Sequence, residues 1–291
     1  MIKADLHMHS TASDGQYAPE EVVRLAAQAG TQLLALTDHD TADGVQRALC
    51  EAKKLGVTLI SGIEMGCSCG LSREVHILGY GVDPAHEAFV RHCREKAERR
   101  EARAEAMVEK LNEAGVMIRL EDVRAMARGV ISRTHIARAL VDAGYANSAP
   151  AAFDKYLKPG KCGYVPRPEF KVAEAIEVIE ATGGVAVLAH PMELGMSDAN
   201  MESLIHEWRG QGLCGMEVYH PTTGNQHLPF LLNLAKREGL IVTGGSDFHG
   251  ERVNERKMRQ GLDRWRTADE DTRRLIGAIE RRKVGVTQCR A

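Results

Sequence analysis

The chain has 291 residues, of which 44% are hydrophobic, so it is long enough to bury a substantial core. Its formal net charge is −2, and this near balance of acidic and basic residues excludes non-specific binding of duplex DNA through a wide basic face. Aromatic residues make up only 4%, too few for stacking platforms along a long single strand of nucleic acid.

Short apolar runs alternate with amphipathic stretches along most of the chain. The runs predict seven strands, at residues 2–6, 33–36, 57–61, 75–80, 185–189, 215–219 and 240–243. The amphipathic stretches predict helices at residues 19–29, 44–55, 171–182, 199–211, 226–238 and 271–283. This alternation is typical of an α/β fold with a parallel sheet and outer helices, and seven such strands favour a closed or distorted barrel. No Gly-x-Gly-x-x-Gly follows the first strand, which argues against a dinucleotide-binding sheet.

The alternation breaks between residues 84 and 170. This segment predicts one long charged helix at 87–114 and shorter helices at 120–128, 134–143 and 150–156. We therefore expect a barrel formed by residues 1–83 and 171–291, with a helical insertion of residues 84–170 that caps the substrate. The charge run at 94–103 is interpreted as a solvated helix face with mixed-sign pairs.

Ionisable side chains follow almost every predicted strand. They are His7, His9, Asp14, Asp38, His39, Asp40, Glu64, His76, His190, His220, Asp247 and His249. Alternate residues of a strand face the same side, so His7 and His9 can meet one metal ion. The carboxyl ends of barrel strands form one face, and buried unpaired carboxylates are costly unless a cation neutralises them. The pattern therefore predicts a metal site, with His76 as its least regular member.

The number of candidate ligands exceeds what one ion needs. Three or four protein ligands serve one open site, so nine candidates indicate two or three divalent ions, with Glu64 and Asp247 able to bridge. Imidazole and carboxylate ligation without thiolate suits Mn²⁺, Fe²⁺, Zn²⁺ or Mg²⁺, and we favour Mn²⁺. Asp38 and Asp40 are interpreted as groups that orient His39 or shape its loop.

These motifs resemble the polymerase and histidinol phosphatase (PHP) family. The resemblance is carried by His7-Met-His9, Asp14, Thr37-Asp38-His39, Glu64, His76, Ala189-His190-Pro191 and Ser246-Asp247-Phe248-His249. It implies a distorted (β/α)₇ TIM-like barrel with a trinuclear site. The implied ligands are His7, His9, Glu64 and Asp247 for one ion, Glu64, His76 and His190 for the second, and Asp14, His39 and His249 for the third.

Within the family, the chain is similar to bacterial 3′,5′-nucleoside bisphosphate phosphatases, whose relatives also trim short RNA from the 5′ end. The segment Ser132-Arg133-Thr134-His135 carries this narrower resemblance. Arg133 and His135 open a predicted helix, whose first N–H groups favour an anion. Lys161 and Arg167, where the insertion returns to the barrel, are candidates to clamp a second phosphate. Tyr219 and His220 are candidates for contact with substrate at the barrel mouth.

We expect metal-activated water to attack phosphorus, because no Ser-His-Asp order or Gly-x-Ser-x-Gly elbow is present. Arg133 would offset charge in the transition state. His190, His220 or a metal-bound water would protonate the leaving oxygen, and the sequence leaves these three open. The predicted reaction removes the 3′-phosphate of 3′,5′-bisphosphonucleosides such as adenosine 3′,5′-bisphosphate, with short 5′-phosphorylated RNA as a further substrate.

Three other functions share part of this pattern. Histidinol-phosphate phosphatase, or another hydrolase of small phosphomonoesters or phosphodiesters, would use the same metal ligands. A C–N amidohydrolase is disfavoured because no predicted strand carries the lysine that such barrels carbamylate. A metal-stabilised scaffold without activity is the non-enzymatic alternative.

The sequence also predicts a cytoplasmic protein. Its seven cysteines are scattered and odd in number, which is typical of reduced thiols. No apolar run is long enough for a bilayer, and a removable signal peptide would take the first ligands with it. We expect no membrane attachment and no obligate protein partner.

Overall fold

The structure is a computed structural model that describes residues 2–68, 74–127, 131–166, 170–250, 267 and 269–289. Seven strands form one sheet in the order of the sequence. They are β1 (Ala4–Asp5), β2 (Leu33–Leu36), β3 (Thr58–Cys67), β4 (Val75–Tyr80), β5 (Val185–Leu188), β6 (Gly215–Tyr219) and β7 (Ile241–Gly244). The Leu6 N–H donates to the Gly244 carbonyl at 3.2 Å, and Met8 bridges Phe248, so the last strand returns to the first. The predicted distorted seven-stranded barrel is confirmed.

One strand runs against the prediction of a parallel sheet. β4 pairs antiparallel with both β3 and β5, whereas the other neighbouring strands pair in parallel. Only residues 68–74 separate β3 from β4. A parallel connection needs a crossover of a dozen or more residues, so this short link permits only an antiparallel pair. The prediction of seven parallel strands was therefore wrong at β4.

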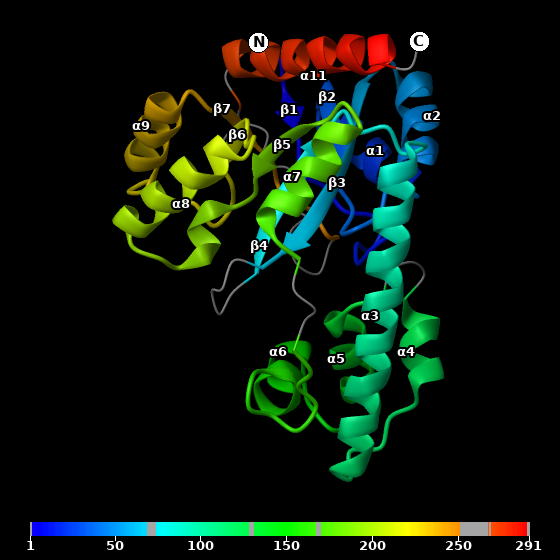
Figure 1. The fold of residues 1–291 in the computed structure, drawn as a ribbon. Coiled ribbons are helices and arrows are strands. Elements are labelled where there is room, and N and C mark those ends of the chain that lie inside the picture. The colour runs from blue at the N-terminus through cyan, green and yellow to red at the C-terminus, as the bar shows by residue number, and fades with distance from the viewer. Residues whose placement is uncertain are drawn as a thin grey trace.

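Helices surround the barrel and close one of its ends. α1 (Pro19–Gln28), α2 (Val45–Leu55), α8 (Asp198–Gly210) and α9 (Leu228–Glu238) come after strands of the barrel. α7 (Val172–Ala181) leads from the insertion into β5, and a short 3₁₀ turn, η2 (Pro191–Leu194), follows β5. α1 shows why such a segment is helical: Pro19 occupies its first turn, Glu21 caps the Ala18 N–H, and Val22 and Ala26 are buried against the sheet. α11 (Asp269–Cys289) lies across the end of the barrel that is remote from the insertion, and Leu275 and Ile279 pack there into the core (Figure 1).

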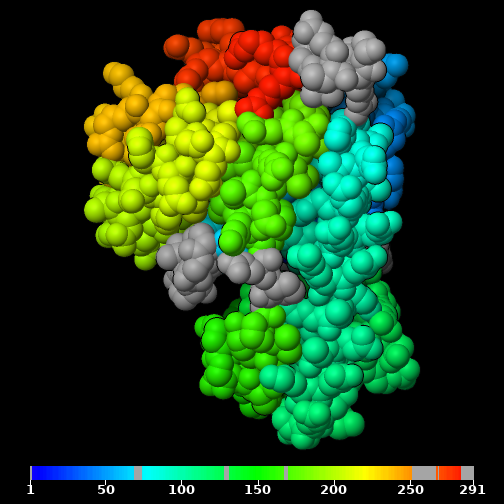
Figure 2. Space-filling view, viewed as in Figure 1, coloured from blue at the N-terminus to red at the C-terminus, as the bar shows by residue number. Residues whose placement is uncertain are grey.

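The insertion forms a second lobe with its own apolar cluster (Figure 2). It contains α3 (Glu87–Glu113), α4 (Leu120–Met126), α5 (Arg133–Asp142), α6 (Ala149–Ala152) and a π-helical turn, η1 (Phe153–Leu157). α3 belongs to both lobes, because Phe89 packs into a barrel cluster while Met107 and Leu111 pack into that of the insertion. The predicted division at residues 84 and 170 stays a prediction, and Arg128, where the second helix of the insertion was expected to end, lies outside the described residues.

Within the described ranges, every helix is too short or too polar to serve as a membrane span.

Candidate metal centre

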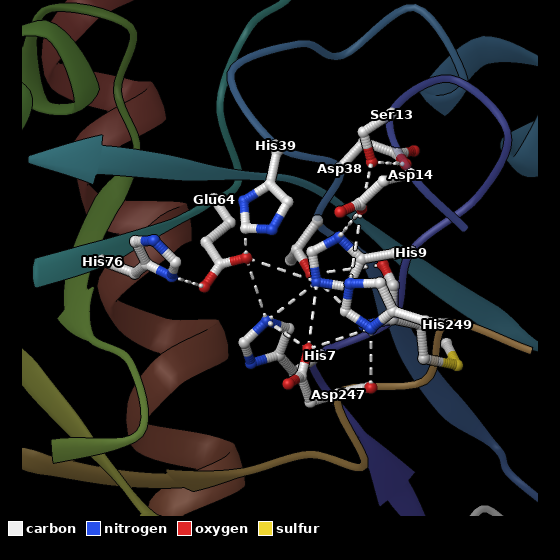
Figure 3. A network of polar contacts seen from close by, with 12 residues as sticks. His7, His9, Ser13, Asp14, Asp38, His39, Glu64, His76, Asp247 and His249 are labelled. Atoms are coloured by element: carbon white, nitrogen blue, oxygen red, sulfur yellow. Dashed lines mark hydrogen bonds and ion pairs between the residues drawn. The ribbon is translucent and has the colours of Figure 1, made fainter. Parts of the chain in front are cut away.

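Most of the predicted ligands meet in one network of polar contacts (Figure 3), and three of them line a hollow together with residues of the insertion. Glu64, on β3, lies at their centre and is 1% exposed. Its Oε1 lies 2.8 Å from His76 Nδ1 and 3.0 Å from His190 Nε2. Its Oε2 lies 3.0 Å from His39 Nδ1 and 3.3 Å from His9 Nε2. One carboxylate thus contacts imidazoles that follow or belong to four different strands.

The antiparallel direction of β4 explains the irregular position of His76 in the sequence. A parallel strand reaches the barrel mouth at its carboxyl end, but β4 starts there. His76 is the second residue of β4 and pairs in register with Gly66, two residues beyond Glu64. The same reversal that contradicts the parallel-sheet prediction therefore brings His76 to the site.

Two further groups flank Glu64. Asp247 Oδ1 lies 3.2 Å from His9 Nε2 and 3.4 Å from His7 Nε2. His249 Nε2 lies 3.3 Å from Asp14 Oδ1. Ligand atoms of His9, Asp14, His39 and His249 lie within 4.8 Å of one another, as do those of His7, His9 and Glu64, of His7, His220 and Asp247, and of His39, Glu64 and His76.

The distances between these ligand atoms match those between neighbouring ligands of one metal ion. Metal–ligand bonds of about 2.1 Å place neighbouring ligand atoms about 3.0 Å apart in an octahedron and about 3.4 Å apart in a tetrahedron. The contacts around Glu64 and Asp247 lie close to these values, from 2.8 Å between His76 and Glu64 to 3.5 Å between His220 and Asp247. Several buried atoms, among them Glu64 Oε2 and His9 Nδ1, have no well-directed hydrogen-bond partner among the described residues. Divalent cations would satisfy such atoms, so the residues fit a metal cluster.

The pKa values of these groups also favour metal binding. Burial raises the pKa of Glu64 and Asp247, but the surrounding imidazoles outweigh burial and hold both pKa values well below the usual range. Burial lowers the pKa of His39 to about 3, so its ring is uncharged at neutral pH and one of its two nitrogens has a free lone pair. The pKa of His249 is raised to about 10, because the charges of Asp247 and Asp14 outweigh its burial. The carboxylates thus stay charged and attract cations to this pocket.

Glu217, on β6, was missed by the sequence analysis. It is fully buried, and its Oε1 lies 3.0 Å from His7 Nδ1, while its Oε2 accepts the His190 N–H at 2.9 Å. A carboxylate on Nδ1 holds the proton there and leaves the Nε2 lone pair of His7 for an ion. The only sequence signal was an acidic residue inside an otherwise buried strand, Gly-Met-Glu-Val-Tyr.

Asp38 and Asp40 support loops rather than the His39 ring. Asp38 accepts hydrogen bonds from the Ser10 N–H and hydroxyl and from the Ser13 hydroxyl, all at 2.7 Å. Asp40 accepts from the Gly66 N–H at 3.1 Å and pairs with Arg100 of α3. The interpretation that they shape the loop matches these contacts. No described contact joins either carboxylate to the imidazole of His39.

Two of the ligand-type residues adopt strained backbone conformations. His190 has φ +24° and Asp247 has φ +51°, as does Asp40 at +52°. Such angles are costly for residues other than glycine and persist where the surroundings impose them, often at functional sites. Gly245 lies directly beside His7, because a Cβ on it would come within 2.3 Å of the His7 Cβ.

An arginine cleft lies beside the cluster, between the barrel mouth and the insertion. We use this name for the hollow of about 160 Å³ lined by Arg100, Arg103 and Arg133 together with Asp14, His39 and His76. Lys96, Arg100 and Arg103 share one face of α3, and Lys96 is buried, with its ammonium over the Phe170 ring at 3.9 Å. The interpretation of the 94–103 run as a purely solvated face was therefore wrong.

The arginines of the cleft crowd one another. Burial, and to a lesser extent the charge of Arg133, lower the pKa of Arg103 to about 10. Burial also lowers the pKa of Arg133. Arg100 is held by Asp40 and Arg103 by the Val165 carbonyl, while Arg133 lies over the Phe153 ring at 5.7 Å. A bound anion would relieve this repulsion.

The structure places the other predicted substrate residues that it describes away from the arginine cleft. His135 is buried on the far side of α5 from the arginine cleft, where its Nδ1 accepts the Ser132 N–H at 3.0 Å. Lys161 is exposed and does not line the cleft. Tyr219 packs against the apolar cluster under α8 and α9, because a register shift between Glu217 and Tyr219 turns it from the mouth. Arg167 lies outside the described residues.

His220 lies beside the cluster, with its Nε2 3.5 Å from Asp247 Oδ2. It is 1% exposed. Its Nδ1 accepts the Thr222 N–H at 3.2 Å, so a neutral ring carries its proton on Nε2.

A barrel whose mouth gathers histidines and carboxylates around a shared glutamate defines a metal-dependent hydrolase. The comparisons with known proteins narrow this class. The PHP domain model matches residues 5–159, so the chain belongs to the PHP family. The protein is a metal-dependent phosphoesterase.

Three relatives illustrate the match. The chain is 38% identical over 251 residues to a 3′,5′-nucleoside bisphosphate phosphatase of Chromobacterium violaceum, covering 86% of this chain and 88% of the relative. It is 36% identical over 247 residues to a 5′-3′ exoribonuclease of Haemophilus influenzae, covering 85% of this chain and 90% of the relative. A Bifidobacterium adolescentis structure assigned as a metal-dependent phosphoesterase matches with a TM-score of 0.82 and 31% identity, covering 94% of this chain and 96% of that one.

Proposed function

We propose that the protein hydrolyses the 3′-phosphate of 3′,5′-bisphosphonucleosides, giving the 5′-monophosphate and inorganic phosphate. The single observation that carries this proposal is the arginine cleft, which opens onto Asp14, His39 and His76. A substrate with two phosphates can place one at the cluster and the other among the guanidiniums. Guanidinium groups favour phosphate through charge-assisted, bidentate hydrogen bonds.

The proposal assigns the ligands in three groups. His7, His9, Glu64 and Asp247 would hold one ion, Glu64, His76 and His190 a second, and Asp14, His39 and His249 a third. The contacts of Glu64 with His76 and His190, and of Asp14 with His249, support this division. Imidazole and carboxylate donors suit Mn²⁺, which we favour over Fe²⁺, Zn²⁺ and Mg²⁺. When bound, such ions polarise phosphoryl oxygens and acidify water.

Three residues would bind the substrate, hold an ion and donate the proton. Of the two roles predicted for Arg133, we favour substrate binding over the offset of transition-state charge: Arg133 would hold the phosphate remote from the reaction, because Arg100 and Arg103 already bind Asp40 and Val165. His190 lies against Glu64 and His76 and is better placed as a ligand than as an acid. We therefore favour His220 as the donor to the departing ribose oxygen: protonated on both nitrogens, its ring would donate from Nδ1 to the Thr222 hydroxyl and from Nε2 to that oxygen, and the transfer would leave it neutral.

The cleft disfavours histidinol phosphate as the substrate. Histidinol phosphate carries one phosphate and an ammonium group, and three crowded guanidiniums would repel that ammonium. A small nucleotide needs neither a membrane nor a protein partner, and we propose that the enzyme acts in the cytoplasm.

Phosphate release tests the proposal. Purified protein with Mn²⁺ is incubated with adenosine 3′,5′-bisphosphate, with adenosine 3′-phosphate and with histidinol phosphate. We expect the bisphosphate to have the highest kcat/KM. Arg133→Ala should lower its kcat/KM about 10- to 100-fold, since a hydrogen bond to a charged group contributes about 1.5–3 kcal/mol. The value for the 3′-phosphate should change little.

Two controls frame this experiment. Arg119→Ala changes an exposed arginine of the insertion that pairs with Glu121 and does not line the arginine cleft, so it should behave as the wild type. His7→Ala should abolish release. If wild-type protein releases no more phosphate from the bisphosphate than His7→Ala does, the proposed function is wrong.

A further inference from the structure

A second hollow opens at the opposite end of the barrel from the metal centre, beside α11, which lies across that end (Figure 1). We call it the basal hollow. Cys214 and Ile241, in its lining, lie at the amino ends of β6 and β7, whereas the metal ligands of parallel strands follow carboxyl ends. Its volume is about 530 Å³, within the range of ligand pockets, about 300–1,000 Å³. It shares no lining residue with the arginine cleft, so the two are separate sites.

Arginines dominate the charge of the basal hollow. They are Arg209 on α8 and Arg274, Arg281 and Arg282 on α11. Glu180, on α7, is the one acidic residue among the described residues that line the hollow. Arg282 Nη2 lies 3.1 Å from the sulfur of Cys214. Four guanidiniums from two helices therefore surround one small space.

Carbonyl groups at the ends of helices and strands hold three of these guanidiniums in place. Arg209 Nε donates to the carbonyl of Glu238, the last residue of α9, at 3.2 Å, and Arg274 Nη2 donates to the carbonyl of the next residue at 3.1 Å. Arg282 Nη1 donates to the Gly184 carbonyl, just before β5, at 2.9 Å. A guanidinium has five N–H donors, so each of the three is fixed and still has donors for a ligand.

The capping of helix ends does not account for the whole cluster. Glu180 pairs with Arg282 at 2.8 Å and Asp271 pairs with Arg274 at 3.0 Å. The negative carboxyl ends of α7, α8 and α9 offset a further part of the charge. Within the described ranges, however, neither Arg209 nor Arg281 has a carboxylate partner, and Arg281 is exposed. Two guanidiniums without a carboxylate match the two charges of a phosphate monoester.

The rest of the lining is uncharged. Ile241, which is 7% exposed, and Ala278 offer apolar surface, and two glycines complete the wall. Such a wall suits the carbon part of a ligand rather than a second charged group. The basal hollow thus has one charged side and one apolar side.

We propose that the basal hollow binds a small organic phosphate monoester, with its phosphate between Arg209 and Arg281 and its organic part against Ile241 and Ala278. The ligand would connect α8 with α11. Because Leu275 of α11 packs into the barrel core, a ligand that binds only the folded chain should also stabilise the fold. This site is independent of the proposed function.

Calorimetric titration of the Mn²⁺-loaded protein with adenosine 5′-monophosphate tests the proposal. We expect two binding sites in the wild type, one at the metal centre and one in the basal hollow. Arg281→Ala should weaken the second site at least about tenfold, because it removes a charge-assisted hydrogen bond, and Arg281→Lys should restore part of the affinity. Arg133→Ala should weaken only the first site. Arg273→Ala, which changes an exposed arginine of the same helix outside the hollow, should bind as the wild type does.

Two further measurements locate the ligand and control for folding. 8-Azidoadenosine 5′-monophosphate should photocrosslink to peptides of α11 or of the starts of β6 and β7 in the wild type, and much less in Arg281→Ala. Phosphate release from adenosine 3′,5′-bisphosphate should be the same in Arg281→Ala and in the wild type, which shows that the variant is folded. Inorganic phosphate, titrated in parallel, lacks the organic part and should bind the basal hollow at least about tenfold more weakly.

The outcomes separate this inference from the proposed function. A single site that Arg133→Ala weakens and Arg281→Ala does not would show that the basal hollow binds no phosphate monoester, and the proposed function would stand. Equal affinity for inorganic phosphate and the nucleotide would overturn the assignment of an organic ligand. If the bisphosphate is not hydrolysed but the nucleotide still binds through Arg281, the proposed function fails and this inference holds.

Discussion

Replacement of Glu217 by glutamine tests whether a buried carboxylate prepares His7 for a metal ion. Glu217 accepts two hydrogen bonds, from His7 Nδ1 at 3.0 Å and from the His190 N–H at 2.9 Å. Glutamine has the same shape but only one accepting oxygen. Its NH₂ group would therefore face one of these two donors inside a fully buried site.

The magnitude follows from this mismatch. A buried donor left without an acceptor costs about 1–3 kcal/mol. His7 can avoid the cost by moving its proton from Nδ1 to Nε2, but Nε2 is the atom that lies 3.4 Å from both Glu64 and Asp247. Either response weakens the metal site. We expect Glu217→Gln to bind Mn²⁺ about 10- to 100-fold more weakly, as replacement of groups that orient metal ligands typically does.

Calorimetric titration with Mn²⁺, together with the metal content of dialysed protein, measures this effect. Glu202→Gln is a matched control, because Glu202 of α8 pairs with Arg237 of α9 at the surface. It should bind metal as the wild type does. If Glu217→Gln also retains wild-type affinity and metal content, Glu217 does not orient His7 and the reasoning fails.

Three other predictions follow from the same centre. Because His249 has a pKa of about 10 without metal and must lose its proton to become a ligand, Mn²⁺ binding at pH 7.5 should release protons, and titrations in buffers of different ionisation enthalpy should show it. Asp40→Asn keeps a side chain that tolerates the positive φ but removes a buried ion pair with α3, so the unfolding free energy in EDTA should fall by about 3–5 kcal/mol in urea melts. Gly245→Ala should displace His7 and abolish high-affinity metal binding, whereas Gly210→Ala, with open space around its Cβ, should not.

Each of these predictions can fail clearly. Heats that do not depend on the buffer would show that His249 binds no metal or carries no proton beforehand. An unchanged urea midpoint for Asp40→Asn would show that the pair with α3 adds no stability. Metal binding by Gly245→Ala equal to that of Gly210→Ala would show that His7 adjusts to the added methyl group.

The metal ligands could be predicted from the sequence because a parallel strand delivers its last residues to a common face. His7, His190 and Asp247 each follow a strand, and Glu64 lies in the second half of β3. The prediction needed no knowledge of strand order, since every carboxyl end reaches the same mouth. The position of His76 at the start of a strand could be explained only once the structure showed that β4 runs antiparallel to its neighbours.

Other features depended on contacts that a linear pattern does not reveal. In the sequence, Glu217 is a single acidic residue within an apolar strand, and its partner His7 lies 210 positions away. Arg100 and Arg103 belong to a helix whose mixed charges look solvated, and only the docking of α3 on the barrel turns one face inward. Tyr219 was expected at the mouth because it ends a predicted strand, but the strand register shifts between Glu217 and Tyr219.

Anomalous diffraction at the manganese absorption edge tests the central claim most directly. Crystals grown with Mn²⁺ should show two or three anomalous peaks, each within about 2.0–2.6 Å of its ligand atoms, with Glu64 shared between two of them. Peaks confined to the protein surface, or an empty barrel mouth in protein saturated with Mn²⁺, would contradict the account.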